Sequence, residues 1–269
     1  MRLNRILLLL LFAIVGNAGT PYQAMIHYPD LPTGTIPHAL VADADGNLFI
    51  VANIVNSAGR PQIQVQKTDS NGSALASLEF GGSVTGAGLS DAIAGAAIDL
   101  KGNLVIAGST SSPDFPLVAP LTAKTGESAA FIVKIDSQLK NILFSTKLGG
   151  AQGGTSATAL ALDPAGNIYV TGTTSDADFP VTPGSFQSQP PLHNQSGSAL
   201  YAYVTEVSSD FKSIVFSTYF GDSVAACTAP ANVPNFCTTA FGRTYTSALA
   251  LDAAGNVIIA GARRPTISP

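Results

Sequence analysis

Short apolar stretches separated by glycine-rich turns run along most of the chain, and one of them recurs as a block. Residues 160–172 read LALDPAGNIYVTG, and close copies occupy residues 96–108 (AAIDLKGNLVIAG) and 249–261 (LALDAAGNVIIAG). A weaker copy, VADADGNLFIVA, covers residues 41–52. Each block has two strand-like runs joined by a tight turn, so the pattern predicts four β-hairpins.

Further strand-like runs complete each unit after its hairpin. They read QIQVQKT (62–68), AFIVKI (130–135), ILFSTKL (142–148), YAYVTEV (201–207) and IVFSTYF (214–220). A fourth unit opens at Ser247 and stops after its first hairpin. Units of four strands that repeat in this way predict the blades of a β-propeller. A β-sandwich also has many short strands, but it would not repeat a twenty-residue block.

We therefore expect an all-β fold, a β-propeller of four-stranded antiparallel blades, with about three and a half blades in this chain. Residues 25–262 would form blades at 33–82, 83–150, 151–222 and 240–262, the last one partial. Because a propeller needs about four blades or more to close, we expect an incomplete propeller or an open arc, and we favour a fragment of a longer multidomain protein. Residues 25–31 form a predicted strand that could complete the last blade.

The turn residues of the repeat have a structural explanation. Aspartate accepts backbone N–H bonds across a turn, and glycine takes a positive φ at which a Cβ would clash. The predicted turn residues are Asp43, Gly46, Asn47, Asp99, Gly102, Asn103, Asp163, Gly166, Asn167, Asp252, Gly255 and Asn256. Two Phe-Pro pairs are predicted to wedge between blades and to end a strand: Phe115, Pro116, Phe179 and Pro180.

The combination of these elements resembles the bacterial SBBP-type β-propeller repeat family. The elements are DxxGN with an apolar strand, then SxxDFP, AFIVKI and ILFSTKLGG, and all are present in the second and third units. The first unit has Ile54-Val55-Asn56 in place of the DFP element, and Arg263-Arg264-Pro265 follows the fourth hairpin. The resemblance implies an exported propeller repeat protein, and it brings no established catalytic residues.

The N-terminus has the pattern of a secretion signal. Arg2 and Arg5 flank an apolar run at residues 6–15, and Gly16 and Ala18 are small residues before a cleavage point. We expect residues 1–18 to be a signal peptide, 19–24 a short leader and 263–269 a tail. The run is too short for a membrane anchor. We therefore expect a secreted, periplasmic or cell-surface protein without a transmembrane segment once the signal is removed.

The two cysteines, Cys227 and Cys237, lie in one loop rich in Pro, Asn and Thr. In an exported protein they are expected to form a local disulfide.

Charged residues make up 11% of the chain and the net charge is −4. Without a basic stripe, nucleic acid is not an expected partner.

Candidate chemistry is sparse. Two carboxylate pairs, Asp43 with Asp45 and Asp176 with Asp178, could act as general acid and base or could cap turns. We favour turn capping because both pairs lie in repeated turns. The histidines, His27, His38 and His193, lack metal-ligand spacing. We predict no cofactor, and weak calcium binding by the DADGN turn stays open.

The segment 149–155 has phosphate-loop glycine spacing without a lysine, so we interpret it as a linker between blades. Three tyrosines are assigned to blade packing: Tyr201, Tyr203 and Tyr219.

Two functions compete on this basis. The first is an exported, non-catalytic repeat scaffold that binds an unknown protein or polysaccharide. The second is an extracellular hydrolase or lyase whose site on the central channel combines single residues from several blades. Three or more convergent ionisable groups in one pocket would favour the enzyme, and loops lined by Ser, Thr and Gly would favour the scaffold.

Overall fold

The computed structural model describes residues 35–83, 91–122, 126, 128–190, 200–220 and 243–264. The predicted signal peptide, leader and strand at 25–31 lie outside the described residues, as do Cys227, Cys237, His27 and His193. Across the described ranges, no helix is long and apolar enough to span a bilayer.

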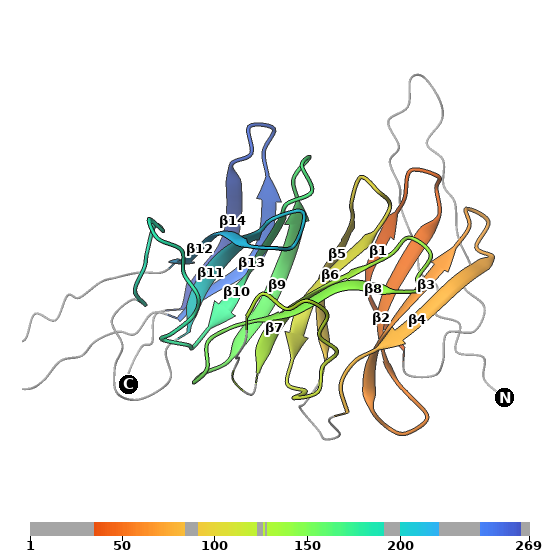
Figure 1. The fold of residues 1–269 in the computed structure, drawn as a ribbon, viewed down its shortest axis with the longest axis horizontal. Helices are drawn as coiled ribbons and strands as arrows, with labels where there is room; N and C mark the ends of the chain where they lie inside the picture. The colour runs from red at the N-terminus through yellow and green to blue at the C-terminus, as the bar shows by residue number, and fades with distance from the viewer. Residues whose placement is uncertain are drawn as a thin grey trace, which may run out of the picture.

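All described regular elements are antiparallel strands in separate sheets that follow one another along the chain (Figure 1). Blade 1 consists of β1 (Ile36–Ala42), β2 (Leu48–Val55), β3 (Pro61–Thr68) and β4 (Ala74–Phe80). Blade 2 consists of β5 (Ala92–Ile98), β6 (Leu104–Thr110), β7 (Ala129–Ile135) and β8 (Ile142–Leu148). Blade 3 consists of β9 (Thr155–Leu162), β10 (Ile168–Thr174), β11 (Tyr201–Val207) and β12 (Ile214–Phe220). A half-blade consists of β13 (Arg243–Leu251) and β14 (Val257–Arg264).

Within each blade the strands pair in chain order. The blades stand side by side from blade 1 (orange) to the half-blade (blue), and the arc that they form is open (Figure 1). The expected all-β propeller architecture is confirmed. The start of the last unit differs from the sequence expectation: β13 begins at Arg243 rather than Ser247, because residues 243–246 pair with residues 261–264 through the backbone.

The core lies between blades, and the alternation of side chains along each strand explains how. In β6, Leu104 and Ile106 pack toward blade 1, while Val105 and Ala107 pack toward blade 3. Successive side chains of a strand point to opposite faces of its sheet. Because both faces of blade 2 meet another blade, both sets of β6 are apolar and buried. This arrangement explains the low charge of the chain.

A glycine in the second strand of each later unit lets the first strand bulge close to it. A Cβ on Gly172 would overlap the carbonyl of Ser156, and a Cβ on Gly108 would overlap that of Ala92. Both sites lie next to register shifts between the paired strands. The apolar repeat therefore has a glycine at this position for close backbone approach.

Candidate functional site

The repeated aspartates fold the hairpin turns. Asp163 Oδ1 accepts the N–H of Asn167 at 2.8 Å, and its Oδ2 accepts the Asn167 side-chain amide at 2.8 Å. The same pair of bonds joins Asp43 to Asn47, Asp99 to Asn103 and Asp252 to Asn256. The turn glycines have φ between +78° and +83°. These carboxylates are engaged by the turn itself.

Two lysines tie the turns to neighbouring strands. Lys67 Nζ lies 3.2 Å from Asp43 Oδ2, and Lys134 Nζ lies 2.8 Å from Asp99 Oδ2. At the corresponding position blade 3 has Glu206. There burial, followed by the negative charge of Glu206, raises the pKa of Tyr169 to about 12. The third blade thus presents an acidic group where blades 1 and 2 present an ammonium.

Buried aspartates hold the connections between blades. Asp91 accepts bonds from the Gly82 N–H (2.8 Å), Thr110 Oγ1 (2.5 Å) and Ser112 Oγ (3.2 Å), and its exposed fraction is 1%. In blade 3 the two positions exchange the carboxylate and the hydroxyl. Thr155 occupies the position of Asp91, and Asp176 occupies the position of Ser112.

Asp176 is 0% exposed and fills the glycine-rich linker that precedes blade 3. It accepts bonds from the N–H groups of Gly150 and Gly153 and from Thr155 Oγ1. Asp178 accepts the Ala151 N–H at 3.1 Å. The backbone donors that could hold a phosphate therefore already bind carboxylates of the chain.

The Phe-Pro pairs lie in buried contacts. Phe115 stacks on Phe131 with ring centroids 4.7 Å apart and meets Phe80 of blade 1 at 6.3 Å. Phe179 packs on Tyr203 at 4.6 Å and on Tyr219 at 5.8 Å. The carbonyls of Pro116 and Pro180 accept bonds from serines of the outer strands. Tyr201, like the two other tyrosines assigned to packing, is buried.

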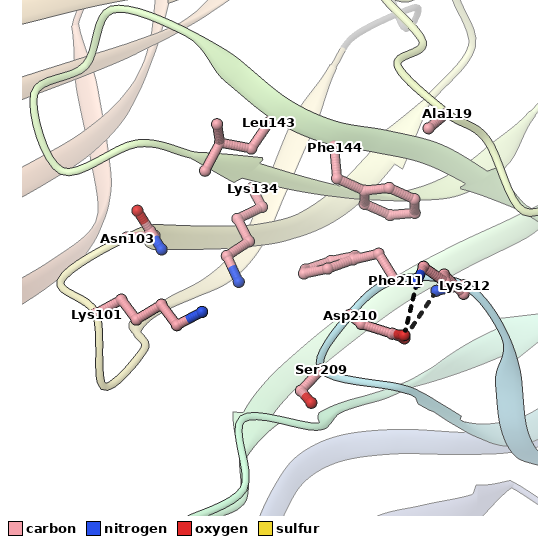
Figure 2. A pocket seen from close by; sticks show the side chains of 10 residues that line it. All are labelled: Lys101, Asn103, Ala119, Lys134, Leu143, Phe144, Ser209, Asp210, Phe211 and Lys212. Carbon is pink, nitrogen blue, oxygen red and sulfur yellow. Dashed lines mark hydrogen bonds and ion pairs between the residues drawn. The ribbon is translucent and has the colours of Figure 1, made fainter.

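A cavity of about 490 Å³ opens between blades 2 and 3. We call it the blade 2–3 groove, and Figure 2 shows the side chains around it. A neighbouring hollow of about 240 Å³ shares Lys101, Lys134, Ser209 and Asp210 with it. The groove is lined by Lys101, Asn103, Ala119, Lys134, Leu143, Phe144, Ser209, Asp210, Phe211 and Lys212.

Three ammonium groups and an apolar wall characterise the groove. Lys101 and Lys134 extend into the same space in front of Phe211 (Figure 2). Lys134 Nζ lies 4.8 Å from the centroid of the Phe211 ring, a cation–π contact. Phe211 packs on Phe144 at 4.2 Å, and Leu143 is 46% exposed.

The carboxylates beside these lysines are held in their ionised form. Burial raises the pKa of Asp99, but hydrogen bonds from Lys134 and Asn103 outweigh it and keep the pKa below its usual value of 3.8. Bonds from the Ser208 hydroxyl and the Lys212 N–H lower the pKa of Asp210. Neither group has the raised pKa of a general acid near neutral pH.

The interface between blades 1 and 2 differs from this groove in one lysine contact. There Lys67 Nζ donates to the Ser137 carbonyl of blade 2 at 3.1 Å and bridges the two blades. In the blade 2–3 groove the residue that corresponds to Ser137 is Ser209, whose N–H donates to Asn167 Oδ1 of its own blade at 3.0 Å. The lysine that corresponds to Lys67 is Lys134, which pairs with Asp99 of its own blade and lines the groove.

The described residues contain no group of three or more His, Cys, Asp or Glu side chains that could hold a metal ion. His38 is exposed on β1. The groove was not foreseen from the sequence, because its lysines come from different units of the repeat and only the packing of two blades brings them together.

The fold and the repeated contacts define a protein built of β-propeller blades. Residues 143–180 match the family model described as SBBP, beta-propeller repeat. Residues 143–180 therefore match the SBBP-type repeat that the sequence resemblance predicted. No curated protein matches the chain.

Several solved structures are similar to parts of the chain. One of them is a protein of unknown function from Bacteroides caccae, with 13% identity over 72% of this chain and 71% of that one and a TM-score of 0.25. A likeness this distant carries no argument about function.

Proposed function

We propose that the chain is an exported, non-catalytic propeller-repeat scaffold that binds an acidic protein or polysaccharide through the blade 2–3 groove. The carrying observation is the charge arrangement of the groove. Lys101, Lys134 and Lys212 line it. Lys134 pairs with Asp99 and Lys212 with Asp210, while Lys101 has no ion pair among the described residues, so the groove keeps an excess of positive charge. An anionic group of a partner would meet the ammonium groups while apolar atoms contact the exposed side of Leu143.

The competing hydrolase or lyase has less support. The groove does gather more than three ionisable groups, which is the condition that favours an enzyme. However, Asp210 of the groove and the adjacent Asp99 have lowered pKa values, and Lys134 is bound to Asp99. A general acid or base needs a pKa near the working pH and a free position beside the substrate.

Two matched lysine variants test the groove. Lys101 and Lys140 both lie in turns of blade 2, and each donates its N–H to the turn aspartate. Only Lys101 lines the groove. Binding to alginate and to polyglutamate would be measured by calorimetry, with uncharged dextran as the reference polymer. Lys101→Glu is expected to weaken binding about tenfold, and Lys140→Glu by less than about twofold. Equal effects of the two variants, or no binding by the natural chain, would refute the proposal.

Export has its own test. The protein recovered from the medium or periplasm of an expressing bacterium is expected to begin at Gly19, as measured by intact mass. A cell-internal protein that retains residues 1–18 would contradict export without affecting the groove.

A further inference from the structure

The outer edges of blades 2 and 3 are covered by the chain itself. In blade 2, the segment after β6 crosses to β8, where Val118 and Ser145 exchange backbone bonds of 3.1 and 2.9 Å. In blade 3, the Thr182 N–H donates to the Ser217 carbonyl at 3.0 Å, and the Ser217 N–H donates to Thr182 Oγ1 at 3.0 Å. Each outer strand therefore has a further segment of the chain bonded to its edge, through two backbone bonds in blade 2 and through one backbone bond and a side-chain hydroxyl in blade 3.

A serine anchors both segments at the same point. Ser145 Oγ donates to the Pro116 carbonyl at 2.5 Å, and Ser217 Oγ donates to the Pro180 carbonyl at 2.6 Å. Both serines are fully buried beneath their segments. The residue that pairs with each serine lies two positions after the proline. A segment with a proline and, two positions later, a residue bonded to the backbone of the serine is thus what this edge holds twice within the chain.

Blade 1 keeps the serine and lacks the segment. β2 passes directly to β3 through a short turn in which Asn56 caps Ala58 and Arg60. Ser77 stands opposite Gln66, as Ser145 stands opposite Val133 in blade 2. Ser77 is exposed, and among the described residues β4 pairs with β3 alone.

The backbone of Ser77 is oriented to accept a further strand. Residues of an antiparallel pair alternate between bonding their partner and facing away from it. Ser145 directs its N–H and carbonyl away from β7, toward Val118. The shared register gives Ser77 the same orientation, so its N–H and carbonyl face outward at an open edge.

Two residues next to this edge differ between blades 1 and 2, and they change which peptide segment the edge of blade 1 would bind. Where blade 2 has Phe131, which stacks on Phe115, blade 1 has Gln64. Where blade 2 has Lys147, blade 1 has Glu79, and Gln64 Nε2 bonds Glu79 Oε1 at 3.0 Å. The residue before the proline would therefore meet an amide and a carboxylate instead of an aromatic ring.

We propose that the edge of β4 around Ser77 binds an extended segment of a partner protein in which a basic residue directly precedes a proline and the residue two positions after that proline is selected by its backbone, since this residue is Val118 in blade 2 and Thr182 in blade 3. The backbone of that residue pairs with Ser77, the proline carbonyl accepts the Ser77 hydroxyl, and the basic side chain meets Glu79. This mode of recognition is addition of a strand to a sheet edge. The site is separate from the blade 2–3 groove and does not depend on its ligand.

The test uses a fluorescent peptide, SPSKPLVAP, titrated with the full chain and followed by anisotropy. Ser77→Pro removes the outward N–H, whose loss an edge strand tolerates, together with the hydroxyl, and is expected to weaken binding by more than about tenfold. Ser77→Ala keeps the backbone bonds and is expected to cost about fivefold. A peptide N-methylated at its valine is expected to lose binding to the natural chain.

A charge exchange tests the selectivity. Glu79→Lys is expected to reject SPSKPLVAP and to bind SPSEPLVAP instead. Thermal unfolding of each variant confirms that the blade remains folded. Equal affinity of the natural chain and Ser77→Pro, or no binding at about 1 mM protein, would overturn the proposal. Unchanged peptide preference in Glu79→Lys would overturn the assignment of the basic residue.

Discussion

The hairpins β9–β10 and β13–β14 have nearly the same sequence and the same turn, yet their environments differ. In each, the turn asparagine N–H lies 2.8 Å from the turn aspartate, and the turn glycine has a φ of +83°. Every residue of β10 is buried, whereas Ile258 of β14 is 55% exposed. In the described part of the chain, β10 has a strand on each edge and a sheet on each face, while β14 pairs only with β13.

The difference separates two sources of order in a blade. The turn and the strand pairing arise within about twenty residues of sequence, so both hairpins form them. Burial arises only when further strands and neighbouring blades are added, because each face of a blade needs another sheet to cover it. Variants in matched positions can therefore measure each source separately.

The largest difference is expected for isoleucine truncation. Ile168 is 0% exposed in β10, so Ile168→Ala is expected to lower the free energy of unfolding by about 2–5 kcal/mol. Ile258→Ala in β14 is expected to cost less than about 0.5 kcal/mol. Urea unfolding followed by circular dichroism measures both. A similar cost for the two would mean that the half-blade is covered in solution.

Glycine substitution should affect the two hairpins alike at the local level. A Cβ on Gly172 overlaps the Ser156 carbonyl, and one on Gly261 overlaps the Tyr245 carbonyl. Gly172→Ala is expected to cost about 1–3 kcal/mol. Both variants are expected to speed amide exchange in their own hairpin, as measured by hydrogen exchange. Gly154→Ala serves as the control, because its nearest neighbour, Ser128 Cβ, would lie 3.6 Å away. Unchanged amide exchange in the β13–β14 hairpin of Gly261→Ala would contradict the explanation that the glycine is needed for close backbone approach within its own hairpin.

Removal of the turn aspartate should have a smaller effect. Asp163→Ala leaves the Asn167 N–H without its acceptor and is expected to cost about 1–2 kcal/mol. Asp252→Ala is expected to cost less, because water reaches the exposed turn and replaces the lost bonds. Chemical denaturation of both variants makes the comparison. A larger effect at Asp252 than at Asp163 would show that the half-blade depends on its turn more than on packing.

The smallest expected effect concerns acid stability. The pKa of Asp99 is lowered, so its contribution to folding is complete above its usual value of 3.8 and is lost as the pH falls through the lower folded value. Asp99→Asn should therefore reduce the melting temperature near neutral pH and flatten its decline in acid. Asp252 lacks an ion pair within the described residues, so Asp252→Asn should flatten the decline less. Melting curves between about pH 2 and 7 test this order.

Much of the fold was predictable because its determinants are local or periodic. The expected bounds of β8, β11 and β12 agree with the structure, since alternation and glycine turns mark both ends of each run. The path of the segments after β6 and β10 was not predictable. They reach the outer strands through backbone bonds at Val118 and Thr182, which leave no periodic signal.

The candidate sites were less predictable than the fold. Asp91 and Ser112 form a hydrogen-bonded pair in blade 2, and Thr155 and Asp176 form the corresponding pair in blade 3 with the carboxylate at the other position. This correspondence becomes clear only when the structure shows the two residues of each pair in contact. The blade 2–3 groove is lined by side chains of two different units, and no local pattern marks that they meet. Contacts between units of a repeat depend on three-dimensional packing, which no single unit encodes.

The sequence by itself determined the hairpins, their turns and the propeller-repeat class of this protein. It could do so because aspartate, glycine and asparagine act on a backbone a few residues away, and because strand side chains alternate with a period of two. Only the tertiary structure decided that β10 is buried while β14 is partly exposed, that blades 2 and 3 leave a lysine-lined groove, and that Ser77 lacks the segment that covers Ser145. These features depend on which surfaces of distant units meet, and that is set by packing across the whole arc rather than by any one repeat.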